Sequence, residues 1–176
     1  MPHMTETRNI GVATKLPLSD IQLHPRNARV VSVETIKESM AANGVYKPIV
    51  VNKGTHTGRP LTCVAGNHSL KAMWQLADEN PTDPRWQEVD VWLIDVDEHR
   101  ETKILVADNA TADNGDYDRE ALAELIGLAG ELFGTGYAQE EVDELNATIT
   151  ASNESSAVAT HYRCPSCHHE WEKEGW

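Results

Sequence analysis

The segment 48–76 constrains the fold of this chain most strongly. Residues 48–51 form a continuous apolar, β-branched run, and residues 60–65 form a second run after a turn at 54–58. These runs predict a β-hairpin. Gly66 follows directly, and in 67–76 the apolar residues fall on one helical face: Leu70, Met73 and Trp74. The sequence therefore predicts that a strand ends at Gly66, where a helix begins.

The flanking segments predict further strands and helices around this unit. Residues 16–23 read as an edge strand or an extended lead-in, and the alternation in 89–96 predicts a third strand of the sheet. Ser32 as N-cap and Gly44 as C-cap predict a helix over 33–43, and Asp97 is expected to cap a helix that continues to Ala107. Helical spacing recurs over 122–133, before the glycines of 134–136, and more weakly over 140–149. The fold class expected is α+β, a small mixed sheet packed with helices.

The chain of 176 residues is long enough for one domain and a tail. We expect an N-terminal extension over 1–15, a domain over 16–149, a small polar linker over 150–160 and a flexible tail over 161–176. No apolar stretch approaches the roughly 18 residues of a membrane span, and residues 1–15 lack the apolar core of a secretory signal. A cytoplasmic protein without membrane contact is expected.

Charge is distributed unevenly along the chain. The formal net charge is −13, but residues 1–75 hold nine Lys and Arg against four Asp and Glu, whereas residues 76–176 hold six against 24. Because phosphate binding is largely electrostatic, we expect any contact with DNA to be local and weak, or made through a partner. The excess of acidic residues over 76–176 has a second explanation, which is that acidic helices merely increase solubility.

Residues 66–71 are the main candidate for chemistry. A glycine at the strand exit lets a ligand approach the backbone, and free amides at a helix N-terminus attract anions. Gly66 and Asn67 supply this backbone, Ser69 a hydroxyl, Lys71 a cation, and His68 a group that donates or accepts a proton. These residues predict a phosphate site, although a glycine and a serine at a helix start also form an ordinary cap.

A second candidate is the pair Asp108 and Asn109, close behind a predicted helix. A carboxylate beside an amide oxygen suits Mg²⁺, which binds one or two carboxylates together with a substrate's phosphates. An acidic helix end without a ligand is the other interpretation of this pair.

The order of these segments resembles the N-terminal domain of ParB proteins, in the ParB/sulfiredoxin superfold. In that family an Asn-Pro-Arg turn, a Gly-x-x-x-Pro-Ile-x-Val box, a Gly-Glu-Arg-Arg box and a Glu-Asn pair follow one another. The matching segments here are 24–29, 44–51, 66–72 and 108–109. The resemblance covers about residues 16–149 and looks nearest to the stand-alone ParB-like proteins of actinobacteria and their phages.

The resemblance implies a nucleoside triphosphate with Mg²⁺ as the ligand. It implies that residues 66–71 and Arg29 bind the nucleotide phosphates and that Asp108 and Asn109 bind the metal. His68 and Ser69 stand where ParB has two arginines, and Asn67 stands where a sulfiredoxin has its nucleophilic cysteine, so sulfiredoxin chemistry is excluded. The chain ends where ParB continues into its helix-turn-helix, so operator binding is not expected.

Three activities remain open under this resemblance: NTP hydrolysis, phosphotransfer and nuclease action in phage or mobile-element DNA metabolism. For each of them Asp108, Asn109 and His68 are the expected catalytic residues. The alternative is a non-enzymatic adaptor that binds DNA or protein through the C-terminal tail.

The tail resembles one half of a zinc ribbon. Cys164 and Cys167 are spaced as in a zinc knuckle and are followed by Trp171, but a structural zinc needs four ligands. His161 and His169 are candidates for the other two, or two chains share one Zn²⁺ in a homodimer. A metal-free tail is the remaining possibility.

Overall fold

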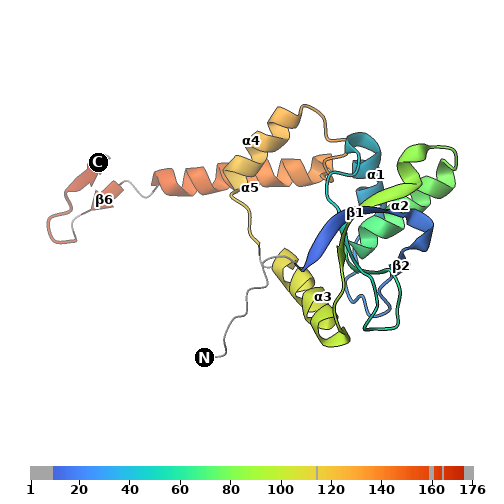
Figure 1. Ribbon diagram of the computed structural model, residues 1–176. Helices are drawn as coiled ribbons and strands as arrows, with labels where there is room; N and C mark the ends of the chain where they lie inside the picture. Colours follow the sequence, from blue (N-terminus) through green and yellow to red (C-terminus); the bar gives the residue numbers. More distant parts are fainter. Residues whose placement is uncertain (1–9, 114, 159–160, 164, 173–176) are drawn as a thin grey trace, which may run out of the picture. The chain divides into compact units, whose positions relative to one another are not determined.

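The computed structural model describes residues 10–113, 115–158, 161–163 and 165–172. The chain divides into two compact units, one ending at Gly115 and one beginning at Asp116 (Figure 1). The boundary between the two units lies inside the range 16–149 that was expected to form one domain. No described helix is long and apolar enough to cross a membrane.

The first unit is built on a five-stranded mixed sheet in the order β1-β5-β3-β4-β2. The β1/β5 and β3/β4 pairs are antiparallel, and the β3/β5 and β2/β4 pairs are parallel. The strands are β1 (Gly11–Pro17), β2 (Gln22–Leu23), β3 (Ile49–Asn52), β4 (Thr62–Ala65) and β5 (Glu88–Ile94). The α+β class with a mixed sheet is confirmed.

Three α-helices complete this unit, with two short 3-10 helices between elements. They are α1 (Val33–Asn43), α2 (Asn67–Glu79), α3 (Glu98–Asp113), η1 (Leu18–Asp20) and η2 (Pro84–Trp86). The limits of α1 are as predicted, because the Ser32 hydroxyl accepts a hydrogen bond from the Thr35 amide and the chain leaves the helix at Gly44.

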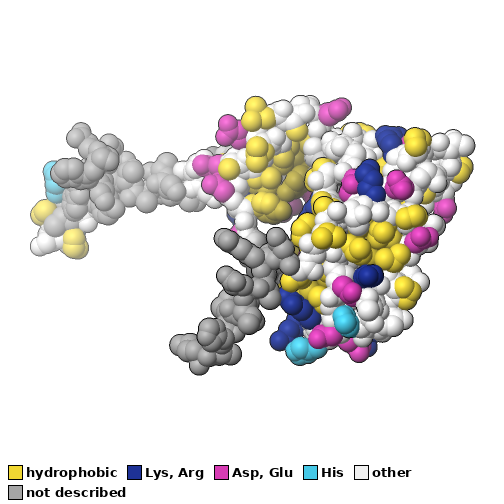
Figure 2. Space-filling view, viewed as in Figure 1, with side chains coloured by type: hydrophobic (Ala, Val, Ile, Leu, Met, Phe, Trp, Pro, Cys, Tyr) yellow, Lys and Arg dark blue, Asp and Glu magenta, His cyan; other side chains and the backbone are white. Residues whose placement is uncertain are grey.

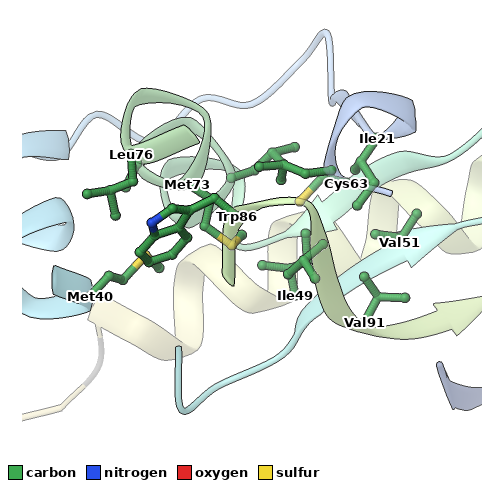
Figure 3. Close-up of a cluster of buried hydrophobic side chains, with 13 residues drawn as sticks. Ile21, Met40, Ile49, Val51, Cys63, Met73, Leu76, Trp86 and Val91 are labelled. Atoms are coloured by element: carbon green, nitrogen blue, oxygen red, sulfur yellow. The ribbon is translucent and has the colours of Figure 1, made fainter. Parts of the chain in front are cut away.

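Both faces of the sheet are covered. Alternate residues of β3, β4 and β5 enter different cores, since successive strand side chains point to opposite faces. Ile49, Val51 and Cys63 pack with α1 and α2, and Figure 3 shows this larger core around Met73 and Trp86. Val64 and Ile94 pack with Leu105 of α3 on the other side. The sheet thus holds α2 and α3 on opposite faces while both pass the end of β4.

The predicted strand over 16–23 was wrong in its extent. β1 starts at Gly11 and ends at Pro17, η1 follows, and β2 is a separate short strand at the opposite edge of the sheet. Residues 11–15, expected in an extension, pair with β5. The pairing with β5, far along the chain, gives residues 11–15 a strand conformation that the sequence pattern did not predict.

The second unit contains α4 (Arg119–Ala129) and α5 (Gln139–Val158), which contact each other. Leu125, Leu128 and Phe133 remain exposed, and Figure 2 shows apolar side chains gathered over α4. α4 ends at Gly130, before the glycines expected to end it.

Residues 150–158, which were expected to belong to a linker over 150–160, form the last part of α5. The stretch contains neither Gly nor Pro, and the hydroxyls of Thr150 and Ser152 donate to carbonyls four residues earlier. Beyond it, β6 (His161–Arg163) and β7 (Glu170–Glu172) form an antiparallel hairpin where a flexible tail was expected.

Candidate functional site

A cavity of about 530 Å³ opens in the first unit where β4 meets α2. Its walls come from the turn after β2, the first turn of α1, the start of β3, the β4–α2 junction and the last turns of α3. Of the residues predicted to act on phosphate or metal, the following line it: Arg29, Gly66, Asn67, His68, Ser69, Asp108 and Asn109.

Gly66 makes the junction possible. Its φ is 91°, and a Cβ built there would lie 2.6 Å from Cγ2 of Ile49. The register of β3 and β4 also shifts immediately before this glycine, between Val50 and Val51. The backbone therefore turns sharply against β3 and starts α2 beside the cavity, where the helix N-terminus favours an anion.

His68 lies on the cavity wall near two cations. Partial burial lowers the pKa of His68, the positive charges of Lys71 and Arg29 lower it further, and a hydrogen bond with the Arg29 backbone partly offsets this. The imidazole is thus biased toward its neutral form, which accepts a proton more readily than an imidazolium.

Lys71 is not part of the same cavity wall. It lines a neighbouring cavity of about 380 Å³, together with Arg29 and His68. Lys71 and Ser69 are two residues apart on α2, which is about 200° around the helix axis, so their side chains leave the helix in different directions. Ser69 and Lys71, predicted to contact one phosphate, thus line two neighbouring cavities.

Asp108 and Asn109 reach the cavity from α3, on the opposite face of the sheet from α2. Burial, and then the negative charge of Asp108, raise the pKa of the Cys63 thiol to about 12. The negative charge of Asp108 therefore disfavours ionisation of a thiol on β4. Carboxylate and amide oxygens are the donors that a hard cation prefers, so this pair fits Mg²⁺ chemically.

A buried polar network joins the elements that carry the two candidate segments. Glu101 of α3 is fully buried, and its carboxylate accepts hydrogen bonds from Nε2 of His24 (3.1 Å), Nδ2 of Asn52 (2.5 Å) and Nη2 of Arg59 (2.5 Å). The His24 amide in turn donates to Oδ1 of Asn67 (2.9 Å), at the start of α2. The network thus connects α3 to the N-terminus of α2.

Burial opposes ionisation of Glu101, but the hydrogen bonds from Asn52, Arg59 and His24 and the charge of Arg59 outweigh it, so the pKa of this carboxyl is lowered. The Arg26 amide donates to Nδ1 of His24 (3.1 Å), which leaves the ring proton on Nε2 for Glu101. The carboxylate is therefore fixed as an ionised acceptor.

The two arginines of the turn after β2 have different surroundings. Arg26 donates to the exposed Glu98 at 2.7 Å and lies outside the cavity lining, while Arg29 lines both cavities. Lys47, which the sequence analysis did not single out, also lines the larger cavity. The sequence signal that could have identified Lys47 was its position directly before the buried strand at 48–51.

The Glu101 network could not be identified from the sequence, because its members are far apart along the chain.

The structure describes some of the predicted zinc ligands in the tail. Cys164 lies outside the described residues, as does the side chain of His161, whereas Cys167 and His169 are exposed between β6 and β7. Within the described part of the chain, no three His, Cys, Asp or Glu side chains are grouped to hold a metal ion.

Neither a protein-family model nor a curated protein matches the sequence. Solved structures do match it. The C-terminally truncated chromosome-partitioning protein ParB from Caulobacter crescentus, in complex with CTP-γ-S, gives a TM-score of 0.53 at 19% identity, over 77% of this chain and 71% of that chain.

Two further structures give lower scores. A Pnob8-like ParB-N domain gives 0.44 at 12% identity, over 92% of this chain and 57% of its own. The truncated Caulobacter crescentus ParB complexed to the centromeric parS site gives 0.36 at 19% identity, over 75% of this chain and 64% of its own. The mixed sheet with its helices, together with the match to the CTP-γ-S complex, shows that this chain has a ParB-like fold.

Proposed function

We propose that this chain is a ParB-like nucleotide-binding protein that holds the phosphates of its ligand at residues 66–69, with Mg²⁺ at Asp108 and Asn109. One observation carries the proposal: two segments about 40 residues apart, one suited to phosphate and one to a hard cation, line the same cavity of about 530 Å³. Phosphoryl ligands need both features within reach of one another.

The phosphate half rests on backbone geometry and on a few side chains. The amides of the first turn of α2, the Ser69 hydroxyl and the Arg29 guanidinium supply donors along the wall. Two arginines of the ParB box are replaced by His68 and Ser69. We therefore expect weaker triphosphate binding than a site with two more guanidinium groups would give.

The metal half would hold Mg²⁺ through one carboxylate and one amide oxygen. Such a site is incomplete without oxygens from the ligand, because Mg²⁺ keeps an octahedral shell of about six donors. Metal and nucleotide should therefore bind together. Bound Mg²⁺ would neutralise charge on the phosphates, and His68 would accept a proton from an attacking hydroxyl or water.

The ParB structure with the higher score was solved with CTP-γ-S. This supports a nucleoside triphosphate as the ligand class and makes CTP the first nucleotide to test. Its context, chromosome partitioning, supports a role in DNA metabolism, such as that of a phage or mobile element. Hydrolysis, phosphotransfer and nuclease action each remain compatible with the proposed residues.

The experiment is isothermal titration of CTP, ATP and GTP with Mg²⁺ into the full chain and into Ser69→Ala. Loss of the hydroxyl donor should weaken binding about five- to tenfold. Ser39→Ala is the matched control, since Ser39 lies on α1 outside the cavity lining. The proposal fails if no nucleotide binds, or if both variants bind as the parent does. Product analysis with nucleotide and with DNA then separates the three activities.

The tail supports a second candidate, an adaptor that acts through a zinc knuckle. The observation that favours it is the β6–β7 hairpin, which presents Cys167 in an exposed turn. We propose that Cys164 and Cys167 bind Zn²⁺, with His161 and His169 of the same chain or with the cysteines of a second chain. Metal analysis of dialysed protein should give one Zn²⁺ per chain in the first case and one per two chains in the second. Zinc-free protein would remove this candidate.

A further inference from the structure

A second cavity lies beside the proposed phosphate site. It measures about 380 Å³ and shares Asn27, Arg29, Val31, Asn67 and His68 with the larger cavity. The two cavities therefore meet at a common wall, here called the shared wall, formed by these five residues. A ligand bound at the shared wall has room on both sides of it.

The smaller cavity is here called the outer cavity and the larger one the inner cavity. The two differ in the residues that line them. Apart from the shared wall, the outer cavity is lined mainly by apolar residues, and among the described residues Lys71 is its one cation besides Arg29. No Asp or Glu belongs to its described lining. Val30 is 91% exposed and Val31 is 37% exposed, so apolar surface at this cavity faces solvent. An apolar group carrying a negative charge would cover that surface and pair with Lys71.

The inner cavity also combines apolar surface with positive charge, and in addition it contains the proposed metal ligands. Ile36, Pro48, Ile49 and Leu105 supply apolar surface, Lys47 supplies a cation, and Asp108 is the one acidic residue in the part of the lining that the structure describes. Each cavity is thus suited to one base and sugar, and each has positive charge near the shared wall. In a chain of net charge −13, three cations and one acid around the two cavities form a local site for anions.

We propose that the site takes a phosphodiester that joins two nucleosides, as in a dinucleotide or a single nucleic-acid strand. The phosphodiester group lies at the shared wall, one nucleoside occupies each cavity, and Lys71 contacts the phosphate of the outer nucleotide. This inference rests on the proposed function, since it assumes that the shared wall binds phosphate, and it adds the class of ligand.

The proposal explains why Lys71 and Ser69 face different cavities. A mononucleotide held at 66–69 and Asp108 fills the inner cavity and leaves Lys71 and Val30 uncovered. A ligand that continues past Arg29 reaches both of them. Stacking and burial of a second base give it additional affinity.

The test compares matched ligands on the full chain by isothermal titration with Mg²⁺. For each of the four bases, the probes are the nucleoside 5′-monophosphate, the 5′-phosphorylated dinucleotide and a 12-mer of one base. The preferred dinucleotide should bind about tenfold or more tightly than its monophosphate. Equal affinity of the dinucleotide and the 12-mer identifies a dinucleotide ligand, and a further gain with the 12-mer identifies a strand.

Variants of the outer cavity complete the test. Lys71→Ala should weaken the dinucleotide about fivefold or more and leave the monophosphate within twofold. Val30→Asp, at a position that is already exposed, should act in the same direction. Lys53→Ala is the control, because Lys53 is exposed and lies outside the lining of both cavities.

Two results overturn the inference while the proposed function stands: equal affinity for monophosphate and dinucleotide, or an equal effect of Lys71→Ala on both. Absence of binding by every probe, and by nucleoside triphosphates, would instead remove the proposed function itself.

Discussion

At the scale of single residues, Gly66 is where the candidate site depends most directly on backbone geometry. Replacing it with Ala places a Cβ at positive φ and within 2.6 Å of Ile49, which is buried. We expect Gly66→Ala to lower the free energy of unfolding by about 2–4 kcal/mol, from the strained backbone and the overpacking together.

Gly58→Ala is the matched control for this prediction. Gly58 also has positive φ, at 68°, but a Cβ there meets nothing within 4 Å. Its substitution should cost about 1 kcal/mol, from the backbone alone. Urea denaturation measures both, and equal losses would show that the contact with Ile49 is unimportant.

Glu101 gives a prediction about pH. Its carboxyl has a folded-state pKa below the ordinary 4.5, so ionised Glu101 contributes stability that is fully present above this value and is lost as pH falls through the folded-state pKa. Glu101→Gln keeps the shape but weakens the bonds to His24, Asn52 and Arg59. The variant should be less stable by about 1–3 kcal/mol at neutral pH.

This difference should shrink as the pH falls through the folded-state pKa of Glu101, because the parent then loses its own carboxylate. Urea denaturation at several pH values tests this. The control is Glu98→Gln, since Glu98 is on the same helix and about half exposed, with surface partners Arg26 and Arg59. It should change stability by less than about 1 kcal/mol. A gap for Glu101→Gln that is constant with pH would contradict the account.

At the scale of elements, α3 begins at a cap that the sequence predicted. The carboxylate of Asp97 accepts a hydrogen bond from the Arg100 amide at 2.8 Å. Asp97→Ala should destabilise the first unit by about 1 kcal/mol. Asp95→Ala removes an exposed carboxylate of equal charge before the helix and should have little effect. Thermal unfolding followed by circular dichroism measures both, and equal stability of the two variants would show that the cap is dispensable.

Local signals predicted those elements whose limits are set locally. The Ser32 cap and Gly44 define α1, and the β-branched runs around the turn at 54–58 define the β3–β4 hairpin. The strand-to-helix junction at Gly66 was predicted for the same reason, because one glycine between two periodic patterns marks it.

Other elements depend on partners that are distant in sequence. β1 is a strand because β5 pairs with it along its whole length, and the residue pattern of 11–17 alone does not place its start. The direction of Lys71 depends on how α2 packs, and burial of Glu101 requires three partners from 42 to 77 residues away. Single-sequence patterns do not contain such contacts.

At the scale of the whole molecule, charge and site location are linked. The net charge of −13 argues against extensive contact with nucleic acid, yet residues 1–75, the basic part of the chain, supply the whole described lining of the outer cavity and most of that of the inner cavity. Binding at so few cations should weaken only moderately with salt, since the salt dependence follows the number of phosphates neutralised. A ligand of one or two nucleotides is consistent with this charge pattern.

The central claim is that a nucleotide and Mg²⁺ bind together in the cavity between α2 and α3. A ligand that binds only the folded chain raises its melting temperature, so thermal shift with CTP, ATP and GTP, each with and without Mg²⁺, tests it most directly. At saturating ligand we predict a rise of about 4 °C or more that requires Mg²⁺ and is lost in Asp108→Ala but kept in Asp95→Ala. An unchanged melting temperature with every nucleotide, or a rise that Asp108→Ala retains in full, would contradict the claim.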